Sequence, residues 1–172
     1  NGTITGIRYF KSAGDGGTHQ GLLYNTSGVL LVQATFAGET ASGWQQVNFS
    51  SPVAITAGQT YVAAYFSSGG SGGNYTSTSN YFTSSVVNGP LTALADGTDG
   101  GNGVYRYSAT PAFPSSSYQK SNYWVDVVFS TAPLPPVANA GSNQTITSPA
   151  SSVTLNASGS TGTITSYLWS QV

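Results

Sequence analysis

The hydrophobic and polar positions of this chain alternate in short runs, and no stretch keeps the apolar period of about 3.6 residues that predicts a helix. The runs are rich in β-branched and aromatic residues and are separated by Gly, Asn and Ser, which is typical of all-β proteins. We expect strands at residues 4–10, 21–24, 30–36, 44–49, 53–55, 61–66, 81–83, 104–108 and 123–129. Strands of this length and spacing predict a jelly-roll-like β-sandwich.

Alternation assigns faces within two of these strands. In residues 4–10 the even-numbered positions are expected on one face of the sheet and the odd-numbered positions on the other. Residues 123–129 are apolar on both faces except for Asp126, which favours a place in the middle of a sandwich sheet. The Gly-, Ser- and Asn-rich residues 67–79 and 95–103 are expected to form surface loops.

A proline-rich segment at residues 131–136 divides the chain. Its prolines cannot donate hydrogen bonds to a sheet and favour a stiff, extended linker. The strand pattern resumes at residues 144–147, 153–157 and 164–172, but about 35 residues are too few for an independent sandwich core. We therefore expect a sandwich at residues 1–130, a linker at 131–136, and the N-terminal part of a second domain at 137–172.

Charged residues make up 5% of the chain, whereas about 25% is usual. The chain has one His and no Cys, so thiol chemistry is excluded and few groups remain for catalysis. A net charge of −1 lacks the basic footprint of nucleic-acid binding, and no apolar run is long enough to span a membrane. Hydroxyls, amides and aromatic rings favour a secreted, cell-surface module that binds neutral polymers or other modules.

The part after the linker resembles the first half of a PKD (polycystic kidney disease) repeat. The resemblance is carried by VANAGSNQTIT at residues 137–147, VTLNASGS at 153–160 and ITSYLWSQV at 164–172. It implies an Ig-like β-sandwich that serves as a spacer in secreted bacterial enzymes and adhesins.

The first domain resembles a family of bacterial modules, the domain of unknown function numbered 4082. The resemblance is carried by GTITGIRYFK at residues 2–11, GWQQVNF at 43–49 and NYWVDVVF at 122–129, among other blocks. It implies a place in a large multidomain secreted protein, and it implies one or two further strands before residue 1, but it implies no activity.

Two catalytic arrangements involve the same few side chains. His19 with Asp15 and a serine would form a Ser-His-Asp arrangement, but no serine lies in a Gly-x-Ser-x-Gly elbow. Asp15 and Glu39 as a glycosidase pair would need to face each other, and nothing in the sequence places them so. We expect a structural His19 that caps a sheet edge or bonds to the backbone, and we do not expect an enzyme.

Calcium is a candidate structural cofactor. Asp96, Asp99 and Asn102 offer two carboxylates and an amide oxygen in one Gly-rich loop, a donor set that Ca²⁺ accepts. Asp15 and Asp126 are alternatives, by analogy with sugar-binding jelly rolls that hold calcium near a sheet edge. The competing interpretation is that Asp96 and Asp99 only form Asx-turns with the backbone.

Asp126 lies within a predicted strand, on the same face as Trp124. If that face is buried, the carboxylate needs a cation, either a metal or one of the strand-borne arginines Arg8 and Arg106. We favour an Arg–Asp pair, which makes Arg8, Trp124 and Asp126 structural residues.

Aromatic residues gather between positions 104 and 124 and alternate with polar ones. A carbohydrate site needs a flat ring against sugar C–H groups and nearby partners for the hydroxyls. The loop residues Tyr75 and Tyr118 are the expected exposed rings, with Arg106, Gln119 and Lys120 as polar partners. Strand positions predict buried or half-buried rings at Tyr105, Tyr107 and Trp124.

These observations favour a non-catalytic extracellular binding module with a glycan ligand. One alternative is a structural or adhesive link in an adhesin or filament, which meets neighbouring modules or further copies of itself through sheet edges and uncharged faces. Another alternative is an accessory domain of a secreted hydrolase whose chemistry lies elsewhere.

Overall fold

The computed structural model describes residues 1–69, 74–133, 135–149 and 152–170. The chain divides into two compact units, Asn1–Ser130 and Thr131–Val172, and the division falls where the proline-rich segment begins. Within the described residues, no helix is long and apolar enough to cross a membrane.

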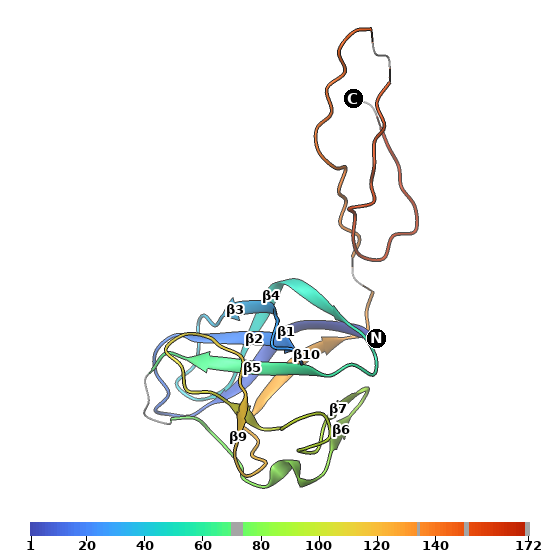
Figure 1. Ribbon diagram of the computed structural model, residues 1–172. Coiled ribbons are helices and arrows are strands. Elements are labelled where there is room, and N and C mark those ends of the chain that lie inside the picture. The colour runs from blue at the N-terminus through green and yellow to red at the C-terminus, as the bar shows by residue number, and fades with distance from the viewer. Residues whose placement is uncertain (70–73, 134, 150–151, 171–172) are drawn as a thin grey trace. The chain divides into compact units, whose positions relative to one another are not determined.

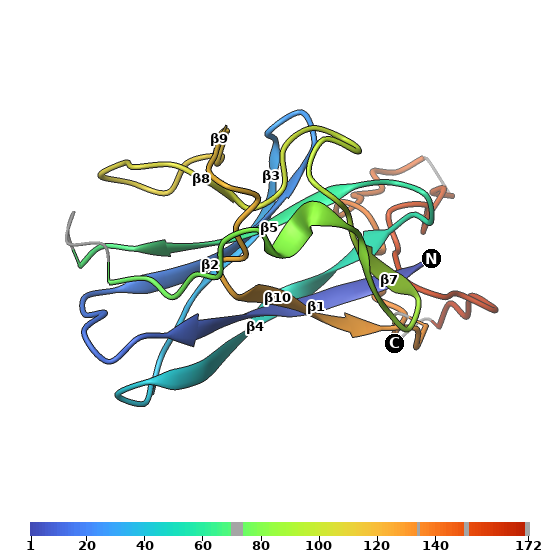
Figure 2. The ribbon, with the colours of Figure 1, turned by 90° about the horizontal axis from the view of Figure 1, so that it is seen from below.

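The first unit is a sandwich of two antiparallel three-stranded sheets (Figure 1). One sheet has the strand order β10-β1-β4, with β1 in the middle (Figure 2), and the other has the order β3-β2-β5. The strands are β1 Gly2–Lys11, β2 His19–Asn25, β3 Leu30–Thr35, β4 Gly43–Ile55, β5 Tyr61–Ser67 and β10 Val125–Ser130. The predicted all-β class is confirmed, and the predicted residues 44–49 and 53–55 are joined in β4.

Both sheets contribute to one hydrophobic core. Its centre is Tyr9, which is fully buried, stacks on Tyr65 and meets Phe36 edge to face. Such ring pairs add to the hydrophobic gain of burying large side chains. The buried cluster comprises Ile4, Ile7, Tyr9, Leu23, Phe36 and Phe49.

A β-bulge changes the face on which Ile4 lies. The register of β1 shifts between Ile4 and Gly6 against both neighbouring strands. Because Thr5 is the extra residue against β10, Ile4 lies in the core with Ile7, although simple alternation placed the two on opposite faces. Glycine is required next to the bulge, since a Cβ on Gly6 would lie 2.3 Å from the carbonyl oxygen of Val47.

The prediction of a strand at residues 81–83 is wrong, because Tyr81–Thr83 form a single 3-10 turn. Asn80 before it has a left-handed φ of 58°, and Phe82 has φ −92° and ψ 38°, so the chain cannot continue as extended backbone. The Phe82 side chain is buried, and its N–H donates to the carbonyl oxygen of Lys120.

The short strands also differ from the prediction. Residues 104–108 supply only β8, Val104–Tyr105, which pairs with β9, Ser116–Ser117. A further hairpin, β6 Val86–Asn88 with β7 Leu91–Ala93, was not predicted. Most residues of this hairpin are exposed. Neither strand therefore has one buried and one exposed face, which is the pattern that alternating apolar and polar residues predict.

The placement of residues 123–129 in the middle of a sheet is wrong. Within the described residues β10 pairs with β1 alone, so it is an edge strand. Val125, Val127 and Phe129 pack against the core, while the Asp126 side chain on the other face is 46% exposed. The order of strands depends on pairing between distant segments, which alternation within one strand does not report.

The predicted loop at residues 67–79 is partly tied to the sandwich. Tyr75 forms an isolated β-bridge with Lys11, and Thr78 forms one with Asn122. Residues 70–73 of this predicted loop lie outside the described residues.

The described residues of the second unit contain no assigned strand, only one antiparallel bridge between Val137 and Thr161. The strands predicted at 144–147, 153–157 and 164–170 are therefore not formed. Leu155 is 50% exposed and Leu168 is 95% exposed, so these extended segments lack the packed apolar face that stabilises a sheet. The linker residue 134 and residues 171–172 of the last predicted strand lie outside the described residues.

Candidate functional site

A cleft of about 650 Å³ opens on the first unit beside β5. Residues 63–69 and 104–110 contribute to its lining. We call it the tyrosine cleft, after Tyr65, Tyr75, Tyr105, Tyr107 and Tyr123, which line it. Its polar lining includes Asp15, Asn74 and Arg106.

Four of the tyrosine rings contact one another. The ring centroid of Tyr123 lies 5.5 Å from that of Tyr75 and 6.1 Å from that of Tyr105, and Tyr105 lies 5.4 Å from Tyr107. A side-chain hydrogen bond with Tyr107, together with burial, raises the pKa of Tyr75. The rings thus hold one another in place, which lowers the side-chain entropy that the cleft itself loses when a ligand binds.

The structure brings two of the predicted ligand residues, Tyr75 and Arg106, into this cleft. The expectation of a buried or half-buried Tyr107 is wrong, since that residue is 72% exposed. The reason is that β8 ends at Tyr105, so the following residues leave the sheet and carry their side chains to the rim.

Tyr118, Gln119 and Lys120 are the remaining predicted ligand residues. They are not among the described residues that line the cleft. They form a tight turn in which Gln119 and Lys120 have left-handed φ values of 51° and 49°. The backbone carbonyls of Gln119 and Lys120 accept hydrogen bonds from the N–H groups of Asn80 and Phe82. This turn therefore fastens two loops together.

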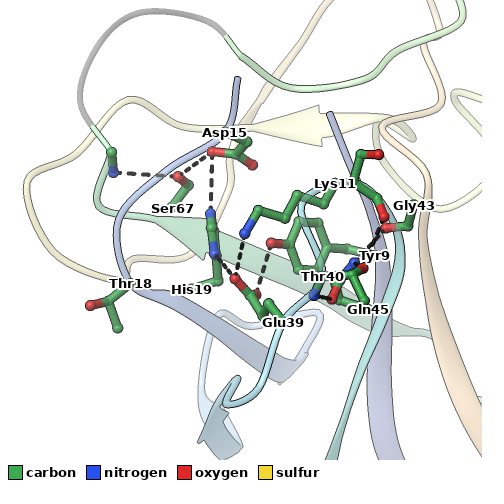
Figure 3. A network of polar contacts seen from close by, with 12 residues as sticks. Tyr9, Lys11, Asp15, Thr18, His19, Glu39, Thr40, Gly43, Gln45 and Ser67 are labelled. Carbon is green, nitrogen blue, oxygen red and sulfur yellow. Dashed lines mark hydrogen bonds and ion pairs between the residues drawn. The ribbon is translucent and has the colours of Figure 1, made fainter. Parts of the chain in front are cut away.

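A chain of polar side chains runs from the cleft into the core (Figure 3). Asp15 is 9% exposed, and its Oδ1 accepts a hydrogen bond of 2.8 Å from the Ser67 hydroxyl and lies 3.2 Å from Nε2 of His19. Nδ1 of the fully buried His19 lies 2.8 Å from Oε2 of Glu39. The imidazole therefore lies between two carboxylates.

Glu39 collects three donors from two strands. The Tyr9 hydroxyl donates to its Oε1 at 3.0 Å, and Lys11 and His19 meet its Oε2 at 2.8 Å each. Burial raises the pKa of the Glu39 carboxyl, but the hydrogen bonds from Lys11, His19 and Tyr9 outweigh it and hold the pKa below its ordinary value. Burial and the Glu39 carboxylate together raise the pKa of Tyr9.

His19 is held differently from what the sequence predicted. Its ring contacts the carboxylates of Asp15 and Glu39, which the sequence did not bring together, instead of capping a sheet edge. The arrangement is not a Ser-His-Asp triad, because the Ser67 hydroxyl donates to Asp15 and not to His19. No local motif signals this cluster, since its members lie on β1, β2, β5 and two loops.

Asp126 pairs with Arg8, one of the two arginines considered, at 2.7 Å. Both side chains are nearly half exposed, so the condition of a buried face does not hold. The Arg8 guanidinium also lies 5.1 Å from the ring of Trp44.

Trp124 adopts a left-handed φ of 51°, and its indole N–H donates to the Thr78 hydroxyl at 3.1 Å. With Phe10 and Trp44 it lines a shallow hollow of about 280 Å³.

The Gly-rich loop considered for calcium is held by its own side chains. Oδ1 of Asp96 accepts a hydrogen bond from the N–H of Asn102, and Oδ1 of Asn102 accepts one from the N–H of Gly103. Asp99 is exposed. The described part of the chain contains no group of three or more His, Asp or Glu side chains arranged to hold a metal ion.

Comparison with protein families confirms both resemblances. The model of the K319L-like, PKD domain matches residues 140–172, and the model of the Domain of unknown function (DUF4082) matches residues 1–125. No curated protein and no solved structure matches the chain. Neither matched domain is typically catalytic, and their combination suggests an extracellular accessory module. A continuous match over residues 1–125 shows that the chain belongs to the DUF4082 family.

Proposed function

We propose that residues 1–130 form a non-catalytic glycan-binding module of a secreted, cell-surface protein, and that the glycan lies in the tyrosine cleft. The observation that carries the proposal is the gathering of five tyrosine rings around one open cleft. Its volume of about 650 Å³ is within the range of small-molecule sites.

The chemistry of the lining supports a saccharide. The faces of tyrosine rings pack against the C–H groups of a pyranose, and their hydroxyls exchange hydrogen bonds with those of the sugar. Asp15, Asn74 and Arg106 add one anionic, one amide and one cationic group. An apolar wall with a few placed polar groups is the usual composition of a specific small-molecule site.

A binding role without catalysis is supported by the way the reactive groups are engaged. Ser67 donates to Asp15, and the buried His19 lies against Glu39 and Asp15. Glu39 in turn holds Lys11 and Tyr9. These contacts stabilise the fold around the cleft.

A second candidate function, adhesion between modules, rests on the outer face of the sheet β10-β1-β4. Trp44 on this face is 45% exposed and contacts Phe10 edge to face. An exposed aromatic cluster of this kind suits contact with another module.

Glycan-array binding followed by isothermal titration calorimetry tests the proposal on the 172-residue chain. We expect Tyr107→Ala to weaken the binding of an array-positive glycan about tenfold, or about 1.4 kcal/mol, because an exposed rim ring is lost. Tyr118→Ala is the matched control, since Tyr118 is also exposed but is not part of the described lining. Absence of binding to any glycan, or an equal loss in both variants, would contradict the proposal.

A further inference from the structure

Asp15 is the anionic group of the described lining of the tyrosine cleft, and it is almost fully buried. Its Oδ1 accepts the Ser67 hydroxyl and faces His19. Its Oδ2 has no hydrogen-bond partner among the described residues and is accessible to solvent. One oxygen is thus anchored to the protein, and the other is available to a ligand.

Among the described residues, no Lys or Arg side chain forms an ion pair with Asp15. Lys11 lies 2.8 Å from Glu39, so those two opposite charges pair with each other. The buried Nε2 of His19 lies 3.2 Å from Oδ1 of Asp15 but makes no hydrogen bond with it.

A buried carboxylate is stabilised by a cation that reaches it, and the rest of the cleft suits one. The faces of tyrosine rings carry negative potential and attract ammonium groups. Arg106 also lines the cleft, but it is exposed, so water and salt screen its charge. The less screened charge belongs to Asp15.

We propose that the tyrosine cleft selects a saccharide with a free amine, whose ammonium group pairs with the Asp15 carboxylate while the faces of its pyranose rings pack against the tyrosines. This inference rests on the proposed glycan-binding function and names its ligand class, an unacetylated amino sugar. Ser67 acts as a positioning residue that orients Asp15.

The test compares oligosaccharides of the same length and linkage that differ only at the second carbon. The full chain is titrated calorimetrically with β-1,4-linked glucosamine, N-acetylglucosamine and glucose oligomers, at a pH that keeps the amine protonated. We expect the glucosamine oligomer to bind about tenfold more tightly than the other two. We expect this preference to shrink when salt is raised from about 50 mM to about 500 mM, because added salt screens the ion pair.

Asp15→Asn keeps the shape of the side chain and the Oδ1 acceptor but removes the charge. We therefore expect the ratio of the affinities for the glucosamine oligomer and the neutral oligomers to fall close to one, with little change in the affinity for the neutral oligomers. Asp99→Asn, in an exposed loop, is the matched control. The wild-type comparison decides the question by itself if Asp15→Asn fails to fold. Equal binding of the three oligomers overturns the inference and leaves the glycan-binding function standing, whereas binding of none overturns both.

Discussion

His19 places its Nδ1 2.8 Å from the Glu39 carboxylate across a separation of 20 residues in the chain. The contact joins the start of β2 to the loop after β3, and Glu39 extends it to Tyr9 and Lys11 on β1 of the opposite sheet. Of the nine formal charges of the chain, Lys11, Asp15 and Glu39 lie in this one network of polar contacts, together with the single histidine. The cluster therefore connects the two sheets next to the tyrosine cleft.

Replacing Glu39 with Gln should destabilise the first unit. A neutral amide presents an N–H₂ group to donors that need an acceptor, and it leaves Lys11 without its counter-charge. We expect the free energy of unfolding to fall by roughly 2–4 kcal/mol, measured by urea denaturation at neutral pH. The exposed Asp99→Asn is the control and should change it by less than about 0.5 kcal/mol. Similar effects of both substitutions would show that the cluster does not stabilise the fold.

Acid should weaken the fold through the same carboxylate. The hydrogen bonds hold the pKa of Glu39 below its ordinary value of about 4.3, so the folded state binds the proton less readily than the unfolded state does. The stabilisation by the Glu39 carboxylate is complete when the pH is above the ordinary pKa. It is lost as the pH falls through the lowered pKa of the folded state. We expect the stability difference between wild type and Glu39→Gln to shrink as urea denaturation is repeated from about pH 7 to about pH 3. A difference that stays constant with pH would contradict this linkage.

Gly21 should not tolerate a methyl group. A Cβ at this position would lie 2.8 Å from Cβ of Ile7 and 3.1 Å from Cγ1 of Val47, so the two sheets would be forced apart. We expect Gly21→Ala to lower the free energy of unfolding by about 1–3 kcal/mol. Gly16→Ala, where nothing lies within 4 Å, is the matched control and should be close to neutral. Thermal unfolding of both variants, followed by circular dichroism, checks the difference, and equal melting temperatures would contradict it.

The Arg8–Asp126 ion pair should contribute little despite its short distance. The two side chains are 40% and 46% exposed, so water screens the attraction. A double-mutant cycle with Arg8→Ala and Asp126→Ala should give a coupling free energy below about 1 kcal/mol in urea denaturation. A coupling well above that value would mean that the pair is more shielded than its exposure indicates.

Lys120→Gly should stabilise the chain, because glycine removes the steric cost of a left-handed backbone at φ 49°. The cost relieved, about 1–2 kcal/mol, exceeds the added entropy of a glycine in the unfolded state, about 0.5–1 kcal/mol. We expect a net gain of roughly 0.5–1 kcal/mol in the free energy of unfolding. Lys120→Ala keeps the strained backbone and should give no gain, so a gain in both variants would trace the effect to the lost charge.

Much of the fold follows from local patterns. The strands predicted at residues 4–10 and 21–24 lie within β1 and β2, and the proline-rich segment begins where the first unit ends, after Ser130. Short sequence blocks along residues 2–129, such as those at 2–11 and 43–49, indicated the family. These features are local because a strand, a turn or a motif is encoded by neighbouring residues.

Tertiary structure alone decided which of the scarce polar groups meet. Whether Asp15, His19 and Glu39 touch depends on the packing of two sheets, and the shift at Thr5 that buries Ile4 depends on the register with β4 and β10. Tyr107 became a rim residue because β8 ended two positions before it. Contacts between distant segments are set by how the sheets close on each other, and a one-residue change of register moves a side chain to the other face. The composition therefore indicated a neutral, aromatic module, whereas the packing gave it a cleft and placed a buried carboxylate there.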